Sequence, residues 1–119
     1  MSLEIRPATA ADRGAILELF RVAFRSEPNP DEWTWKCDRN PLPGISIVAL
    51  DGSRALGFFG SMGTRYRGSG GDLPGTSAVD VMTHPEARKL GHNGLFKQIG
   101  EAFRDVNAAR GVPFDFGFP

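Results

Sequence analysis

The stretch from Val79 to Phe96 contains the residue types that can bind an anion. A strand-like run ends at the turn His84–Pro85, and the basic pair Arg88 and Lys89 is followed by glycines and a helix-like run. Backbone N–H groups at a helix N-terminus are unpaired, and the helix dipole favours negative charge there. Glycines let a phosphate approach these groups, and the two cations add positive charge. The pattern therefore predicts a phosphate site at the start of a helix.

Two well-known phosphate-binding loops do not match this stretch. A Walker A loop requires Gly-x-x-x-x-Gly-Lys-Ser/Thr, which the sequence does not contain. The dinucleotide fingerprint Gly-x-Gly-x-x-Gly does not fit either, because Gly91 and Gly94 have no glycine partner before them. Arg88 and Lys89 also fit a plain role as solvated charges, but cations are unfavourable at a helix N-terminus unless an anion binds. The balance favours a phosphate ligand.

Asp80 is the carboxylate on the strand-like run before this turn. In that place a carboxylate can act as a proton acceptor, directly or through water. A structural role, as a carboxylate at a sheet edge or one that pairs with a loop, is at least as good an interpretation, so both stay open. Of the two histidines, His84 suits a turn position, and His92 suits a surface position from which it can touch a phosphate.

The composition restricts the partners and the location of the protein. The chain has 119 residues, which suits a single domain, and 14 basic residues offset 14 acidic ones. Without a net field to attract them, nucleic acid and membrane surfaces are not expected as partners. Cys37 is the single cysteine, and neither His84 nor His92 lies at metal-ligand spacing from it, so no metal is expected. No signal-peptide pattern or membrane-spanning apolar run is present, which predicts a cytoplasmic protein.

The elements that must position these residues follow the order β-α-α-β-β-β-α-β. Strands are expected at residues 3–6, 45–50, 55–66, 77–83 and 112–118, and helices after a capping box at Thr9 and Asp12, at 31–38 and at 94–110. The last helix has the length of a right-handed crossover between its flanking strands, so those two strands should be parallel. The three strands before it can form an antiparallel meander. The fold class is therefore a mixed α/β (α+β) sheet.

Three details of these elements can be checked directly. The inner face of the last helix is expected to carry Phe96, Ile99, Phe103 and Val106. The glycine-rich stretch 67–75 is expected to be a flexible loop. The strand at 55–66 contains several glycines, which would weaken it unless another segment packs closely against its backbone.

The turn after Asp80 resembles a motif of a known family. Arg88-Lys89-Leu90-Gly91-His92-Asn93 is similar to the pyrophosphate motif Arg/Gln-x-x-Gly-x-Gly/Ala of the GNAT acyl-CoA-dependent N-acetyltransferases, with Asn93 in place of the final small residue and Gly94 directly after it. The resemblance extends along the chain, because the order of other segments also matches. These are Ile5 to Asp12, the hairpin at 45–66, Thr83 to Glu86, and Gly111 to Pro113.

The resemblance implies a role for each matching residue. The backbone of Val81, Met82 and Thr83 would pair with the pantetheine arm of acetyl-CoA, the co-substrate. The amides of Lys89, Leu90, Gly91, His92, Asn93 and Gly94 would hold the pyrophosphate, with Arg88 beside it. The acyl carbonyl would lie where the strands at 77–83 and 112–118 splay apart. A small-molecule or peptide amine would then attack the thioester directly. Trp33 and Trp35 fall where the family builds its acceptor wall, although both also suit core packing.

The family normally continues after its fifth strand with a helix and two more strands. The resemblance therefore implies that residues 1–119 form one acyl-CoA-binding domain that is incomplete at its C-terminus. It also leaves open an alternative function as a non-catalytic acyl-CoA-binding module. An uncovered last strand at 112–118 would favour a homodimer through that region.

Overall fold

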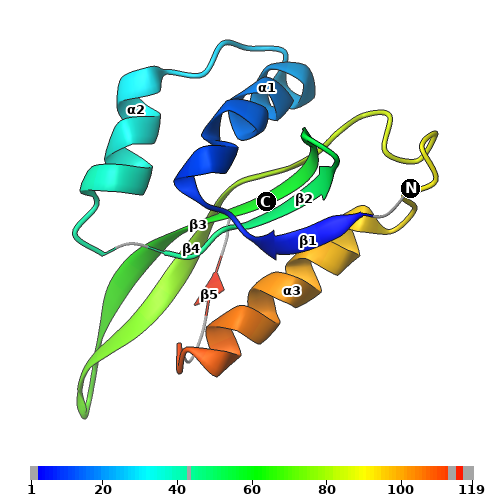
Figure 1. Ribbon diagram of the computed structural model, residues 1–119. Helices are drawn as coiled ribbons and strands as arrows, with labels where there is room; N and C mark the ends of the chain where they lie inside the picture. Colours follow the sequence, from blue (N-terminus) through cyan, green and yellow to red (C-terminus); the bar gives the residue numbers. More distant parts are fainter. Residues whose placement is uncertain (1–2, 43, 113–114, 117–119) are drawn as a thin grey trace.

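The computed structural model describes residues 3–42, 44–112 and 115–116. A sheet with the strand order β1-β2-β3-β4-β5 forms its centre (Figure 1). The strands are β1 (Glu4–Pro7), β2 (Ile47–Asp51), β3 (Arg54–Gly68), β4 (Gly71–Thr83) and β5 (Asp115–Phe116), and the helices are α1 (Arg13–Phe24), α2 (Pro30–Thr34) and α3 (Leu95–Ala109). Neighbouring strands from β1 to β4 are antiparallel, whereas β5 is parallel to β4. The predicted mixed α/β sheet and its parallel crossover are confirmed.

Helices cover both faces of the sheet (Figure 1). Side chains alternate along a strand, so Val48 and Leu50 of β2 face α1 and α2, whereas Ile47 and Ala49 face α3. On the first face the helices contribute Ile16, Leu19 and Trp33 to the core, and on the second face α3 contributes Leu95, Ile99 and Phe103. Because both faces are buried, β2 is a continuous apolar run rather than an alternating one. Within the described part of the chain, no helix is long and apolar enough to cross a membrane.

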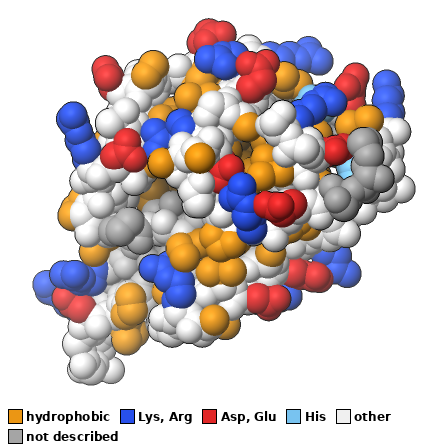
Figure 2. Space-filling view, in the orientation of Figure 1, with side chains coloured by type: hydrophobic (Ala, Val, Ile, Leu, Met, Phe, Trp, Pro, Cys, Tyr) orange, Lys and Arg blue, Asp and Glu red, His pale blue; other side chains and the backbone are white. Residues whose placement is uncertain are grey.

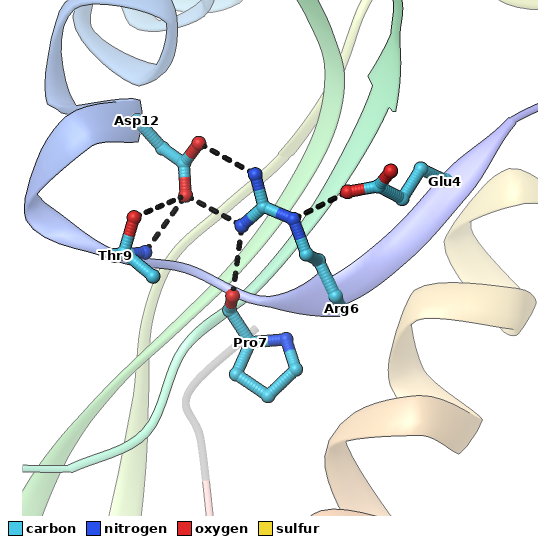
Figure 3. A network of polar contacts seen from close by, with 5 residues as sticks. All are labelled: Glu4, Arg6, Pro7, Thr9 and Asp12. Carbon is cyan, nitrogen blue, oxygen red and sulfur yellow. Dashed lines mark hydrogen bonds and ion pairs between the residues drawn. The ribbon is translucent and has the colours of Figure 1, made fainter.

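The start of α1 is fixed to β1 by a polar network (Figure 3). Asp12 accepts hydrogen bonds from both Arg6 Nη atoms, at 2.7 and 2.9 Å, and from the Thr9 backbone N–H at 2.7 Å. The predicted capping box is therefore confirmed, with a 3-10 turn at Ala10–Asp12 leading into the helix. The Arg6 guanidinium, and after it the Thr9 N–H, hold the pKa of Asp12 well below its usual range although burial opposes this.

The predicted inner face of α3 is wrong at one position. Phe96 is 61% exposed, and Leu95 takes the buried position instead. Leu95 lies four residues before Ile99 and packs over β3, where a Cβ added to Gly57 would approach its Cδ2 to 3.3 Å. Phe96 follows Leu95 by one residue, roughly 100° further around the helix, and its ring is exposed. Because Leu95 and Phe96 are adjacent and both apolar, the sequence alone allowed either of them to take the buried position.

The predicted loop at 67–75 is also wrong. Most of these residues belong to a long β3–β4 hairpin, whose ladder continues to the pair Gly68 and Gly71 around a turn at Ser69–Gly70. Gly71 has a φ of +116°, which glycine adopts without steric cost. The glycines therefore form a tight reversal rather than a flexible connection, and the expected strand 77–83 is only the second half of β4. The hairpin arm projects beyond the helices in Figure 1.

The glycines of β3 have the close neighbours that their presence required. A Cβ on Gly60 would lie 2.3 Å from the Val79 carbonyl oxygen, and one on Gly63 would lie 2.3 Å from that of Leu42. Gly63 also donates its N–H to the Leu42 carbonyl at 2.8 Å. The segment after α2 can therefore run directly over β3 and close one side of a cavity.

Much of the predicted last strand lies outside the described residues. Residues 115–116 pair with β4, and Phe114 and Phe118 are not described. The expected incomplete domain and the dimer through residues 112–118 therefore stay predictions.

Candidate active site

The strand β4 is interrupted by a bulge at Asp80. On either side of it β3 and β4 pair regularly, Phe58 with Met82 and Gly60 with Val79. One residue of β3, Phe59, thus faces two residues of β4, Asp80 and Val81. Asp80 has a φ of +55°, a left-handed conformation that is uncommon outside glycine. The bulge directs the Asp80 side chain toward the layer formed by α1 and α2.

In the part of the chain that the structure describes, one edge of β4 has no strand beside it near the bulge. Within the described residues, β5 pairs with β4 at Thr76 and Ser77, and no strand follows that edge from Ala78 to Thr83. Val81, Met82 and Thr83, the residues assigned by resemblance to the pantetheine arm, all lie on this part of β4. The Met82 side chain is buried in the core, so Met82 can contact a ligand only through its backbone.

The turn between β4 and α3 is anchored by His84. Its N–H donates to the Leu56 carbonyl at 2.7 Å, and its Nδ1 accepts from the Glu86 N–H at 3.1 Å. Nε2 lies 2.9 Å from Arg54 Nη2. Burial, and after it the positive charge of Arg54, lower the pKa of His84. A neutral imidazole in this position holds the turn rather than contributing a charge to it.

Several amides of the predicted pyrophosphate turn are already hydrogen-bonded. The N–H of Leu90 donates to Glu86 and Ala87, that of Gly91 to Arg88, and that of His92 to Ala87. A phosphate bound there would have to share these three amides. The remaining assigned amides are those of Lys89, Asn93 and Gly94, and they are followed by the first amides of α3, which have no acceptor within the helix.

The conformation of this turn depends on glycine. Gly91 has a φ of +86° and Gly94 a φ of +76°, and nothing lies within 4 Å of a Cβ built on either. Arg88 and Lys89 are exposed beside them. His92 is half-buried, with Nε2 3.8 Å from Asp51 Oδ2. Exposed cations, open glycines and a helix start thus occur together, as the sequence predicted, while their role in binding stays a prediction.

A cavity of about 250 Å³ lies between the sheet and the α1–α2 layer. Its lining residues come from the segment before α1, from α1 and α2, from the loop after α2, and from β3 and β4. They include Thr9, Arg13, Trp33, Lys36, Asp38, Ser46, Phe58, Gly60, Val79 and Asp80. Because Val79 and Asp80 belong to the bulged part of β4, the cavity opens directly onto the strand predicted to hold the acyl group.

Lys36 and Asp80 form an ion pair at the wall of this cavity. Nζ lies 2.5 Å from Asp80 Oδ2 and 3.4 Å from Glu32 Oε1, and it sits 4.5 Å from the centroid of the Trp33 ring. The Lys36 side chain is only 11% exposed. It comes from the π-helical segment Trp35–Arg39 that continues α2. Sequence reasoning missed Lys36, because nothing in the local pattern links it to a strand 44 residues away.

The two tryptophans have different surroundings. Trp33 is 3% exposed and packs against Phe20 and Phe58, with ring centroids 5.9 and 6.0 Å away, while one side of it lines the cavity. Core packing and a cavity wall are therefore compatible for Trp33. Trp35 is 48% exposed and does not line the cavity.

The surface shows no preference for one sign of charge on the face in Figure 2. Basic and acidic side chains are interspersed there, with hydrophobic side chains between them. This distribution fits the balanced composition, and the charged groups of interest are those that line the cavity and the turn before α3.

Comparison with known proteins agrees with this architecture. Residues 4–119 match the family model described as acetyltransferase (GNAT) domain. Comparison with curated proteins gave no significant match. Among solved structures, the fold is similar to that of an acetyltransferase from Trypanosoma brucei, with a TM-score of 0.75 and 19% identity over 99% of this chain and 83% of the other.

Two further structures extend this likeness. A transcriptional regulator from Bacillus halodurans C-125 superposes with a TM-score of 0.73 and 22% identity, covering 99% of this chain and 82% of that one. Glucosamine-6-phosphate N-acetyltransferase from Arabidopsis thaliana gives a TM-score of 0.74 at 12% identity, covering 100% and 83%. At these identities the likeness establishes the fold, and the family model establishes the family. The chain belongs to the GNAT acetyltransferase family.

Proposed function

We propose that this chain is an N-acetyltransferase that transfers an acetyl group from acetyl-CoA to an amine by direct attack. The observation that carries the proposal is the position of Asp80. It lies at the β4 bulge, beside a strand edge without a neighbouring strand in the described residues, and it lines the cavity. One residue thus borders both the place for a thioester and the place for an acceptor.

The chemistry requires positioning and a proton acceptor. The acceptor nitrogen forms a bond with the acetyl carbonyl carbon, the carbon–sulfur bond breaks, and CoA leaves as its thiol. The nitrogen attacks as the neutral amine, and it then loses one proton while the departing sulfur gains one. Asp80, the cavity carboxylate at the bulge, could receive the proton from the nitrogen. The backbone of Val81 to Thr83 would align the pantetheine arm as an added strand, which fixes the thioester relative to the amine.

The turn before α3 supplies the remaining binding energy in this proposal. The Arg88 and Lys89 side chains, the amides of Lys89, Asn93 and Gly94, and the first amides of α3 would receive the pyrophosphate of acetyl-CoA. The amides of Leu90, Gly91 and His92 would contribute by sharing their present hydrogen bonds.

One observation favours a second function, a non-catalytic acyl-CoA-binding module. The Asp80 carboxylate already pairs with Lys36, so in this conformation the Lys36 ammonium group occupies the place of an acceptor amine beside it. Calorimetry with acetyl-CoA and a thiol-release assay over a panel of amines separate the possibilities. Binding together with amine-dependent thiol release supports the transferase. Binding without release from any amine supports the module, and absence of binding contradicts both.

A further inference from the structure

The ammonium group of Lys36 is enclosed by groups that recognise alkylammonium ions. Asp80 and Glu32 provide carboxylate oxygens at 2.5 and 3.4 Å from Nζ, and the Trp33 ring lies below it at 4.5 Å. Charge-assisted hydrogen bonds and cation–π contact are the two interactions by which proteins hold primary ammonium groups. We call these three side chains, Glu32, Trp33 and Asp80, the ammonium cage.

The main walls of the cage are fixed, whereas its occupant can move. Trp33 is packed into the core between Phe20 and Phe58, and Asp80 is held by the bulge of β4. Lys36 enters on a flexible four-carbon stem, so its side chain can leave through a change of rotamers without moving either wall. A cage with rigid walls and a mobile occupant can exchange that occupant.

We propose that Lys36 is an internal occupant of a subsite for the ammonium group of the acceptor. In this view the acceptor is a primary amine on an unbranched alkyl chain, similar to a lysine side chain. It binds only when Lys36 withdraws, which makes Lys36 an intramolecular competitor. Neutral alcohols and weakly basic aromatic amines would not fill the cage. The identity of the subsite as the acceptor site rests on the proposed function, but the binding of an alkylammonium ion there does not.

The experiment uses n-butylammonium, which matches the lysine side chain beyond Cα, and no acetyl-CoA. Its dissociation constant is measured by calorimetry, and the shift it causes in the melting temperature is measured alongside, for the wild-type chain and for Lys36→Met. Removing the competitor should tighten binding by about tenfold or more, the scale expected for freeing a charge-assisted contact. Lys97→Met is the matched control, since Lys97 is 82% exposed on α3 and should leave the affinity unchanged.

Two further arms test the chemistry of the cage. In Lys36→Met/Asp80→Asn the gain should be lost, because the carboxylate that receives the ammonium is gone. Butan-1-ol, which has the same shape without the charge, should not bind Lys36→Met measurably. If Lys36→Met is isolated unfolded, n-butylammonium should restore its fold in a concentration-dependent manner and butan-1-ol should not.

Several results would overturn the inference. These are equal affinity of the wild type and Lys36→Met, equal binding of the alcohol and the ammonium ion, or an unfolded variant that the ion does not restore. Failure of the transferase proposal looks different, because n-butylammonium would bind as expected while no variant released thiol from acetyl-CoA. Conversely, transfer to amines without any effect of Lys36→Met would contradict this inference alone.

Discussion

Lys36 and Asp80 join the π-helical segment after α2 to β4 through an ion pair of 2.5 Å between Nζ and Oδ2. The pair closes one side of the cavity between the helical layer and the sheet. Both side chains are largely buried, at 11% and 20% exposure, so each depends on the other for compensation of its charge. An acceptor can therefore contact Asp80 only after the Lys36 ammonium group has moved away from it.

Asp80→Asn should lower turnover by about a hundredfold or more while leaving CoA affinity unchanged, because the amide cannot take a proton. The limb of the pH–rate profile that reports the base should disappear as well. Steady-state thiol release across a range of pH, with calorimetry for CoA, measures both effects. Asp105→Asn, an exposed position on α3, serves as the control. Undiminished turnover in Asp80→Asn would remove this residue from the mechanism.

Arg88→Glu should weaken CoA binding by about 1–3 kcal/mol, since a cation beside the pyrophosphate is replaced by an anion. Arg104→Glu makes the same change of charge at an exposed position further along α3 and should have a much smaller effect. Calorimetry of both variants with CoA gives the comparison. Equal losses would mean that only the net charge matters and that the turn before α3 is not the phosphate site.

Asp12→Asn should lower the free energy of unfolding by about 1–3 kcal/mol at neutral pH, because it breaks the bonds to Arg6 and Thr9. The pKa of Asp12 is depressed in the folded chain, so its contribution is complete above the ordinary carboxyl pKa of about 4 and is lost as pH falls toward the folded value. The free energies of unfolding of the wild type and of Asp12→Asn, measured in urea, should therefore become equal as the pH falls.

Glu4→Gln is the control for this effect. Glu4 also contacts Arg6, but its side chain is 63% exposed, so water screens the pair and a smaller loss is expected. A difference between wild type and Asp12→Asn that does not shrink in acid would contradict the role given to this carboxylate.

Gly60→Ala should destabilise the chain by about 1–3 kcal/mol, because the new methyl group would meet the Val79 carbonyl oxygen and the Phe58 ring next to the bulge. Gly14→Ala adds the same group within α1, where nothing lies within 4 Å, and should stabilise the helix by about 0.5–1 kcal/mol. If this packing is correct, denaturant unfolding should show a lower free energy of unfolding for Gly60→Ala and a higher one for Gly14→Ala. Two changes of the same sign would show that the close contact at Gly60 is relieved elsewhere.

Local patterns in the sequence predicted most of the framework. The helical spacing of Ile16 and Phe20 and the reach of Asp12 back to Thr9 depend only on residues within a turn or two of each other. The parallel arrangement of β5 and β4 followed from the length of the intervening helix. Such features are set by local geometry, so a single sequence contains enough information to find them.

The parts that could not be predicted depend on contacts between distant segments. The choice of Leu95 over Phe96 for the buried position was decided by the surface of β3. The bulge at Asp80 and Val81 has no glycine to mark it, since its conformation is imposed by the pairing on either side. Asp80 was selected by its position before the turn, but its partner Lys36 became visible only when α2 was placed over the sheet.

The bulge also separates the site from changes in the rest of the hairpin. Residues three apart on a regular strand point to opposite faces, yet Val79 lines the cavity and Met82 packs in the core on the same side of the sheet. Beyond the bulge the ladder runs without interruption from the pair of Gly60 and Val79 to the pair of Gly68 and Gly71. Residues added in pairs at the tip would lengthen the hairpin without changing which side chains at its base point toward the cavity. The arm can therefore diverge in length between relatives while Asp80 keeps its orientation toward the cavity.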